Sequence, residues 1–389
     1  MARSHFFFDS GALSPAFALR PASPPPYLNS NNGSYFSTQP HCARLNLTRR
    51  PAVETAAING SDGARVYVVS DLHTDYSENM SWLSSLLSHN DRQSVLLVAG
   101  DVAETHKNFV VSMSILRDKF DRVFFVPGNH DLWLRREKTD YLSSLDKLDK
   151  LLEACEQLGV ETKPSMVDGV GIIPLYSWYH ESFDEERDIT GIRIPSLAMV
   201  IYFLSPSKDL SSLSNPTEIK LSEDVLYVTL HGSGLASFSR LCTTHCHWKV
   251  DMMLLVCSIG MQELCPEKRM LFYPNLPKVI GSTYLEKRIR AIHGADRQLP
   301  ACHVFGHTHF CWDAVLEGIR YVQAPLAYPR ERKRRMNGGD DWLPFCIYSS
   351  GNFSEKLSPC YWSDHYSANP RTPDVTELAP WVARYYSKV

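Results

Sequence analysis

Seven polar side chains follow four short apolar runs of the sequence, each at the point where a run ends. They are Asp71, His73, Asp101, Asn129, His130, His307 and His309. The patterns Asp-x-His and His-x-His place two donors on one short turn, and the asparagine adds a neutral oxygen. Mixed oxygen and imidazole donors suit borderline divalent ions such as zinc, manganese and iron better than calcium or magnesium. The pattern therefore predicts a binding site for such ions.

The apolar runs that precede these residues have the length and composition of buried β-strands. They cover residues 66–70, 95–99, 123–126 and 302–305. Open α/β sheets bind their ligands at the carboxyl ends of the strands, so we expect the polar turns to share one sheet edge.

Segments with helical periodicity follow each of the first three runs. They are Ser81–His89, Lys107–Phe120 and Tyr141–Leu158, the last followed by Gly159 as a helix C-cap. This β-α-β-α-β order predicts a parallel sheet with right-handed crossovers. Further along, Gly169–Pro174 is expected to be a short strand, and Glu317-Gly318 is expected to turn a hairpin between Ala314–Leu316 and Ile319–Val322. The polar C-terminal tail is expected to wrap the domain.

Composition narrows the functional classes. The chain has 389 residues, enough for one large domain with appendages or for two, and 44% of them are hydrophobic. A net charge of −3 and a pI of about 6.6 argue for neither nucleic acid nor an anionic membrane as a partner. No apolar run reaches the roughly 18 residues of a membrane-spanning helix. Ten cysteines without a Cys-x-x-Cys pair indicate a reducing compartment rather than a disulfide scaffold.

The order and wording of the four motifs carry a family resemblance. The motifs are Ser70-Asp71-Leu72-His73, Gly100-Asp101, Gly128-Asn129-His130-Asp131 and Gly306-His307-Thr308-His309. With them the chain resembles the calcineurin-like metallophosphoesterases, over about Arg65–Ala198 and Gln262–Val389. In its detailed sequence the chain is similar to a plant subgroup of the family. The resemblance implies a four-layer α/β/β/α sandwich, expected over residues 64–389, with metal ions at one sheet edge.

The resemblance also implies which residues hold the metal ions, which would be two divalent ions of manganese, zinc or iron. Asp71, His73 and His309 would hold the first ion, and Asn129 and His307 would hold the second. Asp101 would bridge the two. A pair of ions about 3.5–4 Å apart clamps the phosphoryl oxygens of a substrate and lowers the pKa of a bridging water. The implied reaction is hydrolysis of a phosphoester bond by metal-bound hydroxide.

A further histidine completes the implied catalytic set of His130, Asp101 and Glu104. In the family, the histidine at the position of His130 lies over the substrate oxygens, as a general acid or charge stabiliser. Two carboxylates are close enough in sequence to orient its imidazole, Glu104 and Asp131.

One region departs from the family pattern. The family supplies a further histidine to the second metal from a strand between the third and fourth motifs, but here the matching apolar run ends in Cys257. The surrounding segment, Met199–Met261, does not resemble the family. It indicates either an error in the gene model or a genuine variant whose second metal is weak or absent. His231 and Cys257 are the candidate replacement ligands. A cramped cluster, Cys242-x-x-His245-Cys246-His247, is a weaker candidate for a separate zinc site.

The first 63 residues differ in kind from the rest. Before Glu54 the only acidic residue is Asp9, against five arginines, and Pro-rich and Asn/Ser-rich patches are frequent. Basic, hydroxyl-rich and acid-poor leaders are typical of organelle transit peptides. With the plant-like resemblance, this predicts a chloroplast location. The alternative is a disordered tail without targeting function on a cytoplasmic protein.

Two other features remain open to more than one interpretation. The run Arg330–Arg335 is either a solvated basic loop, a surface that steers anionic substrates, or a nucleic-acid contact. The aromatic residues Trp133, Trp178, Tyr179 and Phe183 either pack in the core or line a substrate wall.

The sequence as a whole predicts a metal-dependent hydrolase that acts on a small phosphorylated substrate. The alternative is a phosphate-binding pseudo-enzyme that is catalytically impaired because it lacks the second-metal histidine. After Gly-Asp-Val-Ala-Glu the chain lacks the Asp-Arg-Gly continuation of serine/threonine protein phosphatases, which argues against a phosphoprotein substrate. A nucleic-acid partner and a membrane are not expected, and the sequence does not define an oligomeric state.

Overall fold

The computed structural model describes the chain in eleven segments. They are residues 63–89, 93–137, 143–176, 183–192, 194, 252–257, 262–293, 300–332, 341, 343–357 and 359–387. Several features predicted above lie outside these segments. They are the leader, Trp178, Tyr179, His231, the cluster at 242–247, most of Met199–Met261 and Lys333–Arg335.

The first sheet contains the strands that carry the first three motifs, in the order β11-β10-β1-β2-β3. The strands are β1 (Arg65–Ser70), β2 (Ser94–Ala99), β3 (Arg122–Val126), β10 (Phe345–Ser349) and β11 (Asn352–Phe353). As predicted, β1, β2 and β3 are parallel. β10 joins the other edge of β1 in the antiparallel sense, although it comes from the far end of the chain. Every residue of β2 is buried, as expected for a central strand covered on both faces.

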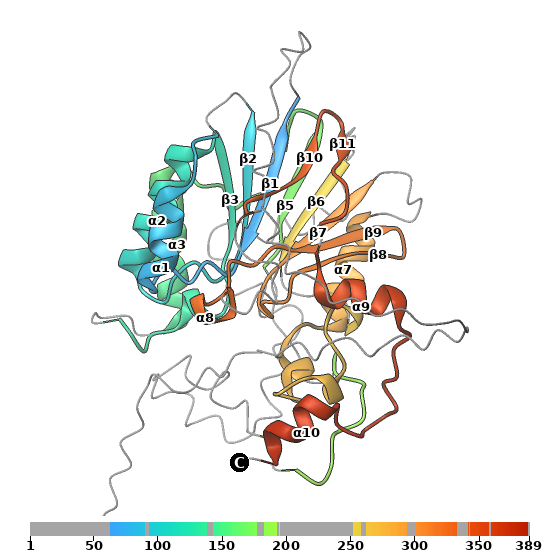
Figure 1. Cartoon of the computed structure of the whole chain (residues 1–389). Helices are drawn as coiled ribbons and strands as arrows, with labels where there is room; N and C mark the ends of the chain where they lie inside the picture. Colours follow the sequence, from blue (N-terminus) through green and yellow to red (C-terminus); the bar gives the residue numbers. More distant parts are fainter. Residues whose placement is uncertain are drawn as a thin grey trace, which may run out of the picture.

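Three helices pack beside this sheet (Figure 1). They are α1 (Ser77–Ser85), α2 (His106–Lys119) and α3 (Ser144–Leu158). The side chain of Thr105 caps α2, and Gly159, with φ of 70°, ends α3 as predicted. The predicted bounds of the first helix were wrong by four residues at each end. Asn79 anchors its first turn by donating to the carbonyls of Leu72 and Ala327, and the helix ends before Leu87, which is 79% exposed.

The second sheet has the strand order β4-β5-β6-β7-β9-β8. The strands are β4 (Ser165–Val167), β5 (Val170–Pro174), β6 (Met252–Cys257), β7 (Ala301–Phe305), β8 (Trp312–Leu316) and β9 (Ile319–Gln323). β5, β6, β7 and β9 are parallel, and β8 pairs with β9 in the predicted hairpin. The turn residues Glu317 and Gly318 both have positive φ, as a tight two-residue hairpin turn requires.

The two sheets share one hydrophobic core. Buried side chains of β1, β2 and β3 form a single cluster with those of β5, β7 and β9, and the same cluster includes the inner faces of α1, α2 and α3. A second core forms around the C-terminal helices, where Trp362 and Val382 are buried. The fold is therefore mixed α/β, with the carboxyl ends of both sets of parallel strands at the candidate site.

The remaining elements are short or belong to the second core. They are the helices α7 (Thr283–His293), α8 (Pro329–Arg332), α9 (Tyr361–Ala368) and α10 (Pro380–Tyr386), and the 3₁₀ helices η1 (His130–Leu132), η5 (Gln262–Leu264), η6 (Lys268–Met270) and η7 (Leu276–Val279). None of the described helices combines the length and the hydropathy that a membrane span requires.

Candidate metal centre

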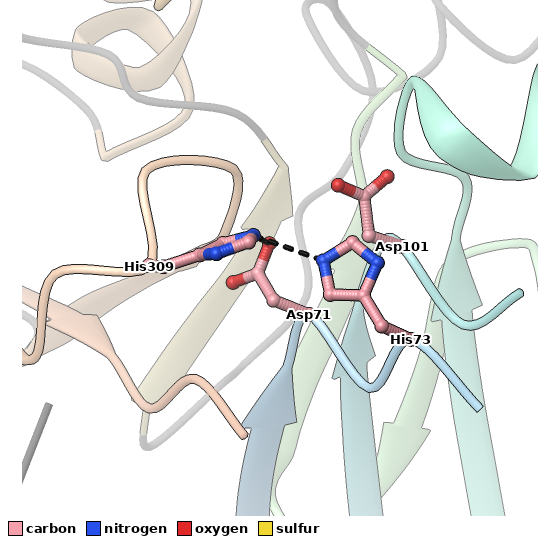
Figure 2. Close-up of side chains that lie close together, drawn as sticks. All are labelled: Asp71, His73, Asp101 and His309. Atoms are coloured by element: carbon pink, nitrogen blue, oxygen red, sulfur yellow. Dashed lines mark hydrogen bonds and ion pairs between the residues drawn. The ribbon is translucent and has the colours of Figure 1, made fainter. Parts of the chain in front are cut away.

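The carboxyl ends of β1, β2 and β7 bring four of the predicted ligands together. The ligands are Asp71, His73, Asp101 and His309, and one donor atom from each lies within 4.8 Å of the others. Figure 2 shows the two imidazoles and the two carboxylates on neighbouring turns that follow the strands. All four side chains are buried, so their donor atoms meet away from bulk water.

The four ligands, together with His307, lie on backbone turns of an uncommon kind. Asp71, His73, Asp101, His307 and His309 all have positive φ, between 44° and 85°. Such a conformation costs a non-glycine residue about 1–3 kcal/mol, and it persists where the surroundings enforce it. Here Asp71 N donates to the carbonyl of Gly100 at 3.1 Å, and His73 N donates to that of Asp101 at 2.9 Å. These strained backbone conformations therefore occur at residues of the sequence motifs.

Two glycines of the motifs are required by close packing at the site. A Cβ atom on Gly128 would clash with the carboxylate of Asp101, and one on Gly306 would clash with the carbonyl of Ala99. Glycine is needed at both positions because a side chain there would keep the third and fourth motifs away from the turn after β2.

The charges of the four residues suit a bound cation. Burial, together with the neighbouring carboxylates of Asp71 and Asp131, raises the pKa of Asp101 well above its usual value. Burial also raises the pKa of Asp71. Two buried carboxylates so close together are favoured in their ionised form when a positive charge lies between them. The donor set therefore fits a divalent metal ion.

The two histidines of the cluster present ring nitrogens to the same point. Nε2 of His73 and Nε2 of His309 are 2.9 Å apart. Burial, followed by the neighbouring histidines, lowers the pKa of His73 well below its usual value, which keeps its ring neutral and able to bind a metal. Nδ1 of His309 lies 2.9 Å from Oε2 of Glu331. A carboxylate in this position holds the proton on Nδ1 and leaves Nε2 as the ligand atom.

Glu331 also changes the charge of His309. Burial disfavours the charged imidazole, but the carboxylates of Glu331 and Asp71 outweigh burial and raise the pKa of His309 to about 9. A metal ion that binds Nε2 of His309 must therefore displace a proton.

Asn129 and His307, predicted for the second metal, lie beside this cluster. Oδ1 of Asn129 is 2.9 Å from Nδ1 of His307, and the backbone N of His307 donates to Oδ1 of Asp71 at 2.7 Å. Burial, followed by His309 and His130, lowers the pKa of His307 to about 4, so its ring is neutral at pH 7. The two residues thus offer an amide oxygen and a neutral imidazole next to Asp71.

The strand that should supply the missing histidine is present. β6 pairs in parallel with β7, and its last residue, Cys257, is in register with Phe305. Phe305 precedes Gly306-His307, so the backbone of Cys257 lies at the same sheet edge as the second-metal residues. Of the two candidate replacements, only Cys257 is within the described residues.

His130 lies in a cage of aromatic and charged groups. Its Nδ1 is 3.3 Å from Oε1 of Glu104, and its ring centroid is 3.6 Å from that of Trp133. Glu104 in turn pairs with Arg135 and Arg136. Burial opposes ionisation of Glu104, but His130 and Arg135 lower its pKa to about 2, so it carries a full charge.

Of the two carboxylates considered for orienting His130, Glu104 is the one that contacts the imidazole. Asp131 instead accepts from the backbone N of Val102, Ala103 and Gly128, at 2.8, 3.0 and 2.8 Å. It ties the turn after β3 to the turn after β2.

Three site residues were missed by sequence reasoning. Tyr328 places its hydroxyl 3.4 Å from Nε2 of His130, and its ring centroid lies 4.4 Å from that of His73. Gln323 donates to Oδ2 of Asp71 at 3.4 Å. The third is Glu331, and one signal pointed to it, because it is the single acidic residue in a basic run.

That basic run is not an exposed loop over its described part. Arg330–Arg332 belongs to α8, where Glu331 is buried and Arg332 donates to Oδ1 of Asn79 at 2.6 Å. Of the predicted aromatic wall, Trp133 contacts His130 with its ring tilted by 36°, and Phe183 packs in the second core.

Comparisons with known proteins agree with the motifs and the geometry. Residues 64–233 match the family model of the calcineurin-like phosphoesterases. The chain is 27% identical over 284 residues to the [acyl-carrier-protein] phosphodiesterase PptH of Mycobacterium tuberculosis, covering 69% of this chain and 80% of that protein. The crystal structure of the phosphopantetheinyl hydrolase PptH from the same organism has a similar fold, with a TM-score of 0.52 at 24% identity over 76% of this chain and 96% of that one. The ordered motifs, the match to this family model over residues 64–233 and the buried cluster of aspartates and histidines therefore make the chain similar to the calcineurin-like phosphoesterases.

Proposed function

We propose that this chain hydrolyses a phosphodiester bond with the help of two divalent metal ions. The observation that carries the proposal is the convergence of Asp71, His73, Asp101 and His309 on one point, with His130 beside them. The preference for a diester comes from the relative named as an acyl-carrier-protein phosphodiesterase. The first substrate to test is therefore the phosphopantetheinyl diester of an acyl carrier protein.

The residues divide into two ligand sets that share a carboxylate. Asp71, His73 and His309 would hold the first ion, Asn129 and His307 would hold the second, and Asp101 would lie between them. Divalent ions held there would neutralise the phosphoryl oxygens and lower the pKa of a nucleophilic water. In fold terms, we infer the four-layer α/β/β/α order, which the shared core of the two sheets supports.

His130 would then assist the leaving group. Glu104 holds the proton on Nδ1 of His130, and Nε2, which lies 3.4 Å from the hydroxyl of Tyr328, would then contact a substrate oxygen. Burial lowers the pKa of His130 to about 4, although Glu104 raises it in part. An anionic diester bound against the ring favours its protonated form. The imidazole would therefore gain a proton as substrate binds and donate it to the departing oxygen.

A second candidate function has a specific observation in its favour. β6 ends in Cys257 instead of a histidine, so the second ligand set contains two side chains besides Asp101. A chain that binds one metal ion and phosphate, without turnover, would be a phosphate-binding pseudo-enzyme.

One experiment separates the two. The purified chain is loaded with manganese or zinc, its metal content is measured by elemental analysis, and it is incubated with bis(p-nitrophenyl) phosphate and with a holo acyl carrier protein. Two ions per chain together with release of p-nitrophenol or of phosphopantetheine support the hydrolase. One ion without turnover supports the pseudo-enzyme. Two ions without turnover on either diester refute the diesterase assignment.

A further inference from the structure

Two cysteines from distant parts of the chain meet beside the candidate metal centre. Cys311 lies two residues after His309, and Cys360 is the N-cap residue of α9. Their Sγ atoms are 3.0 Å apart. Both residues are buried, at 1% and 0% exposure, in a small apolar cluster with Leu357.

This distance is shorter than ordinary packing produces. Non-bonded heavy atoms attract best at roughly 3.5–4.0 Å, and bonded sulfur atoms lie about 2.05 Å apart. The pair therefore needs to close by only about 1 Å to become a disulfide. Four other cysteines whose side chains the structure describes show no such approach, since Cys155, Cys265 and Cys302 are buried in the two main cores and Cys346 donates to the carbonyl of Tyr348.

Hydrogen bonds between backbone and buried or partly buried side chains fix the backbone on each side of the pair. Oδ2 of Asp313, in β8, accepts from the backbone N of Leu357 at 2.7 Å. The backbone N of Asp313 donates to Oγ of Ser363 at 3.3 Å. The backbone N of Cys360 donates to Oδ2 of Asp364 at 2.9 Å. These bonds hold β8 and the start of α9 together whatever the state of the sulfur atoms.

We propose that Cys311 and Cys360 are a disulfide-forming pair that fastens α9 to the turn carrying His309. With hydrogen peroxide as oxidant, one thiol takes one oxygen of the peroxide to give a sulfenic acid, and the other oxygen leaves as water. The second thiol then attacks that sulfur, the S–S bond forms and another water leaves. Two electrons pass from the sulfur atoms to one peroxide. In a reducing compartment the pair stays as two thiols, so the link depends on the redox state.

The bond would join residues 49 positions apart in sequence. Closing a loop of this length restricts the unfolded chain and raises the melting temperature, by about 5 °C for a domain of this size. Because both sulfur atoms are buried, exchange with external thiols is expected to be slow once the bond has formed. These expectations do not depend on the proposed hydrolase activity.

The test compares the full chain after incubation with hydrogen peroxide and after incubation with a phosphine reductant. Each sample is denatured, alkylated and digested, and the peptides are identified by mass spectrometry. A peptide pair linked through Cys311 and Cys360 in the oxidised sample alone, with a melting temperature several degrees above that of the reduced sample, is the expected result. Cys360→Ser should lose both effects, and Cys346→Ser, the matched control, should keep both.

Two outcomes would overturn the proposal. One is full alkylation of Cys311 and Cys360 after peroxide treatment, which would mean that no bond forms. The other is a linked pair with an unchanged melting temperature, which would mean that the bond does not fasten the segment. Both measurements are made on the natural chain, so neither depends on a variant that folds.

Discussion

The candidate metal centre divides into a first half, with Asp71, His73 and His309, and a second half, with Asn129 and His307. The two halves differ in how firmly neighbouring groups hold their side chains. In the first half, Asp71 accepts hydrogen bonds from Oγ of Ser70 at 2.5 Å and from the backbone N of His307 at 2.7 Å, and His309 is paired with Glu331. In the second half, Asn129 and His307 contact each other at 2.9 Å. The strand that completes this half in the family ends here in Cys257.

A metal centre is therefore specified by its supporting residues as well as by its ligands. Pre-oriented ligands lose little conformational freedom when an ion binds, and neighbouring carboxylates strengthen ligating histidines. We therefore expect the two halves to bind metal with unequal affinity, tightly at the first and weakly at the second.

The largest effect is expected at the residue that the two halves share. Asp101→Asn keeps the oxygen that accepts from the backbone N of His130 at 2.8 Å, but it removes the charge. We expect kcat/KM for bis(p-nitrophenyl) phosphate to fall about 10³-fold, which corresponds to about 4 kcal/mol of transition-state stabilisation. Asp149→Asn, an exposed change on α3, serves as the control. Activity within tenfold of the natural chain would rule out Asp101 as a bridging ligand.

A smaller loss is expected when the support of the first half is removed. Glu331→Gln leaves an oxygen that can still accept from Nδ1 of His309 but takes away the charge that fixes the ligating tautomer. We expect the affinity for the first metal ion to fall about 30-fold, as for other partners of ligating histidines. Competition with a chelator of known affinity measures it. An unchanged affinity would mean that Glu331 supports the fold of α8 alone.

The second half can be strengthened instead of weakened. Cys257→His places an imidazole at the strand end where the family has its histidine, next to Phe305 in the sheet register. We expect the affinity for the second ion to rise about tenfold in a manganese titration, because imidazole suits this ion better than sulfur does. Cys257→Ser, which adds no imidazole, is the matched control. An unchanged affinity for the second ion would mean that the missing ligand comes from another part of the chain.

Sequence reasoning located the strand-and-turn motifs because they are local. The run 66–70 and the turn that follows it are neighbours in sequence, and an apolar run that ends in Asp-x-His carries its own signal. Glu331 and Tyr328 could not be placed in this way, since their contacts are set by tertiary packing between distant segments. The same is true of β10, which joins β1 from the far end of the chain. For α1, the hydrogen bonds of the buried Asn79 fix the start of the helix. The spacing of the apolar residues after Asn79 predicts a helix that begins and ends too late in the sequence.

The smallest effect is expected at Tyr328, which belongs to neither ligand half and covers the first. Its hydroxyl lies 3.4 Å from Nε2 of His130, a long hydrogen bond that a phosphoryl oxygen can replace at little cost. Tyr328→Phe keeps the ring over His73 and removes only the hydroxyl. We expect kcat/KM to fall about fivefold, the value of one neutral hydrogen bond, with the metal content of the chain unchanged.

Tyr76→Phe is the matched control for this change, because the ring of Tyr76 touches that of Tyr328 at a centroid distance of 5.4 Å and its substitution removes a hydroxyl from the same aromatic pair. If Tyr328→Phe lowers the metal content as well as the activity, the hydroxyl of Tyr328 supports the metal ligands and does not act on the substrate. Tyr328 would then be a third supporting group of the first half, beside Glu331 and Ser70. We would then expect a larger difference between the metal affinities of the two halves.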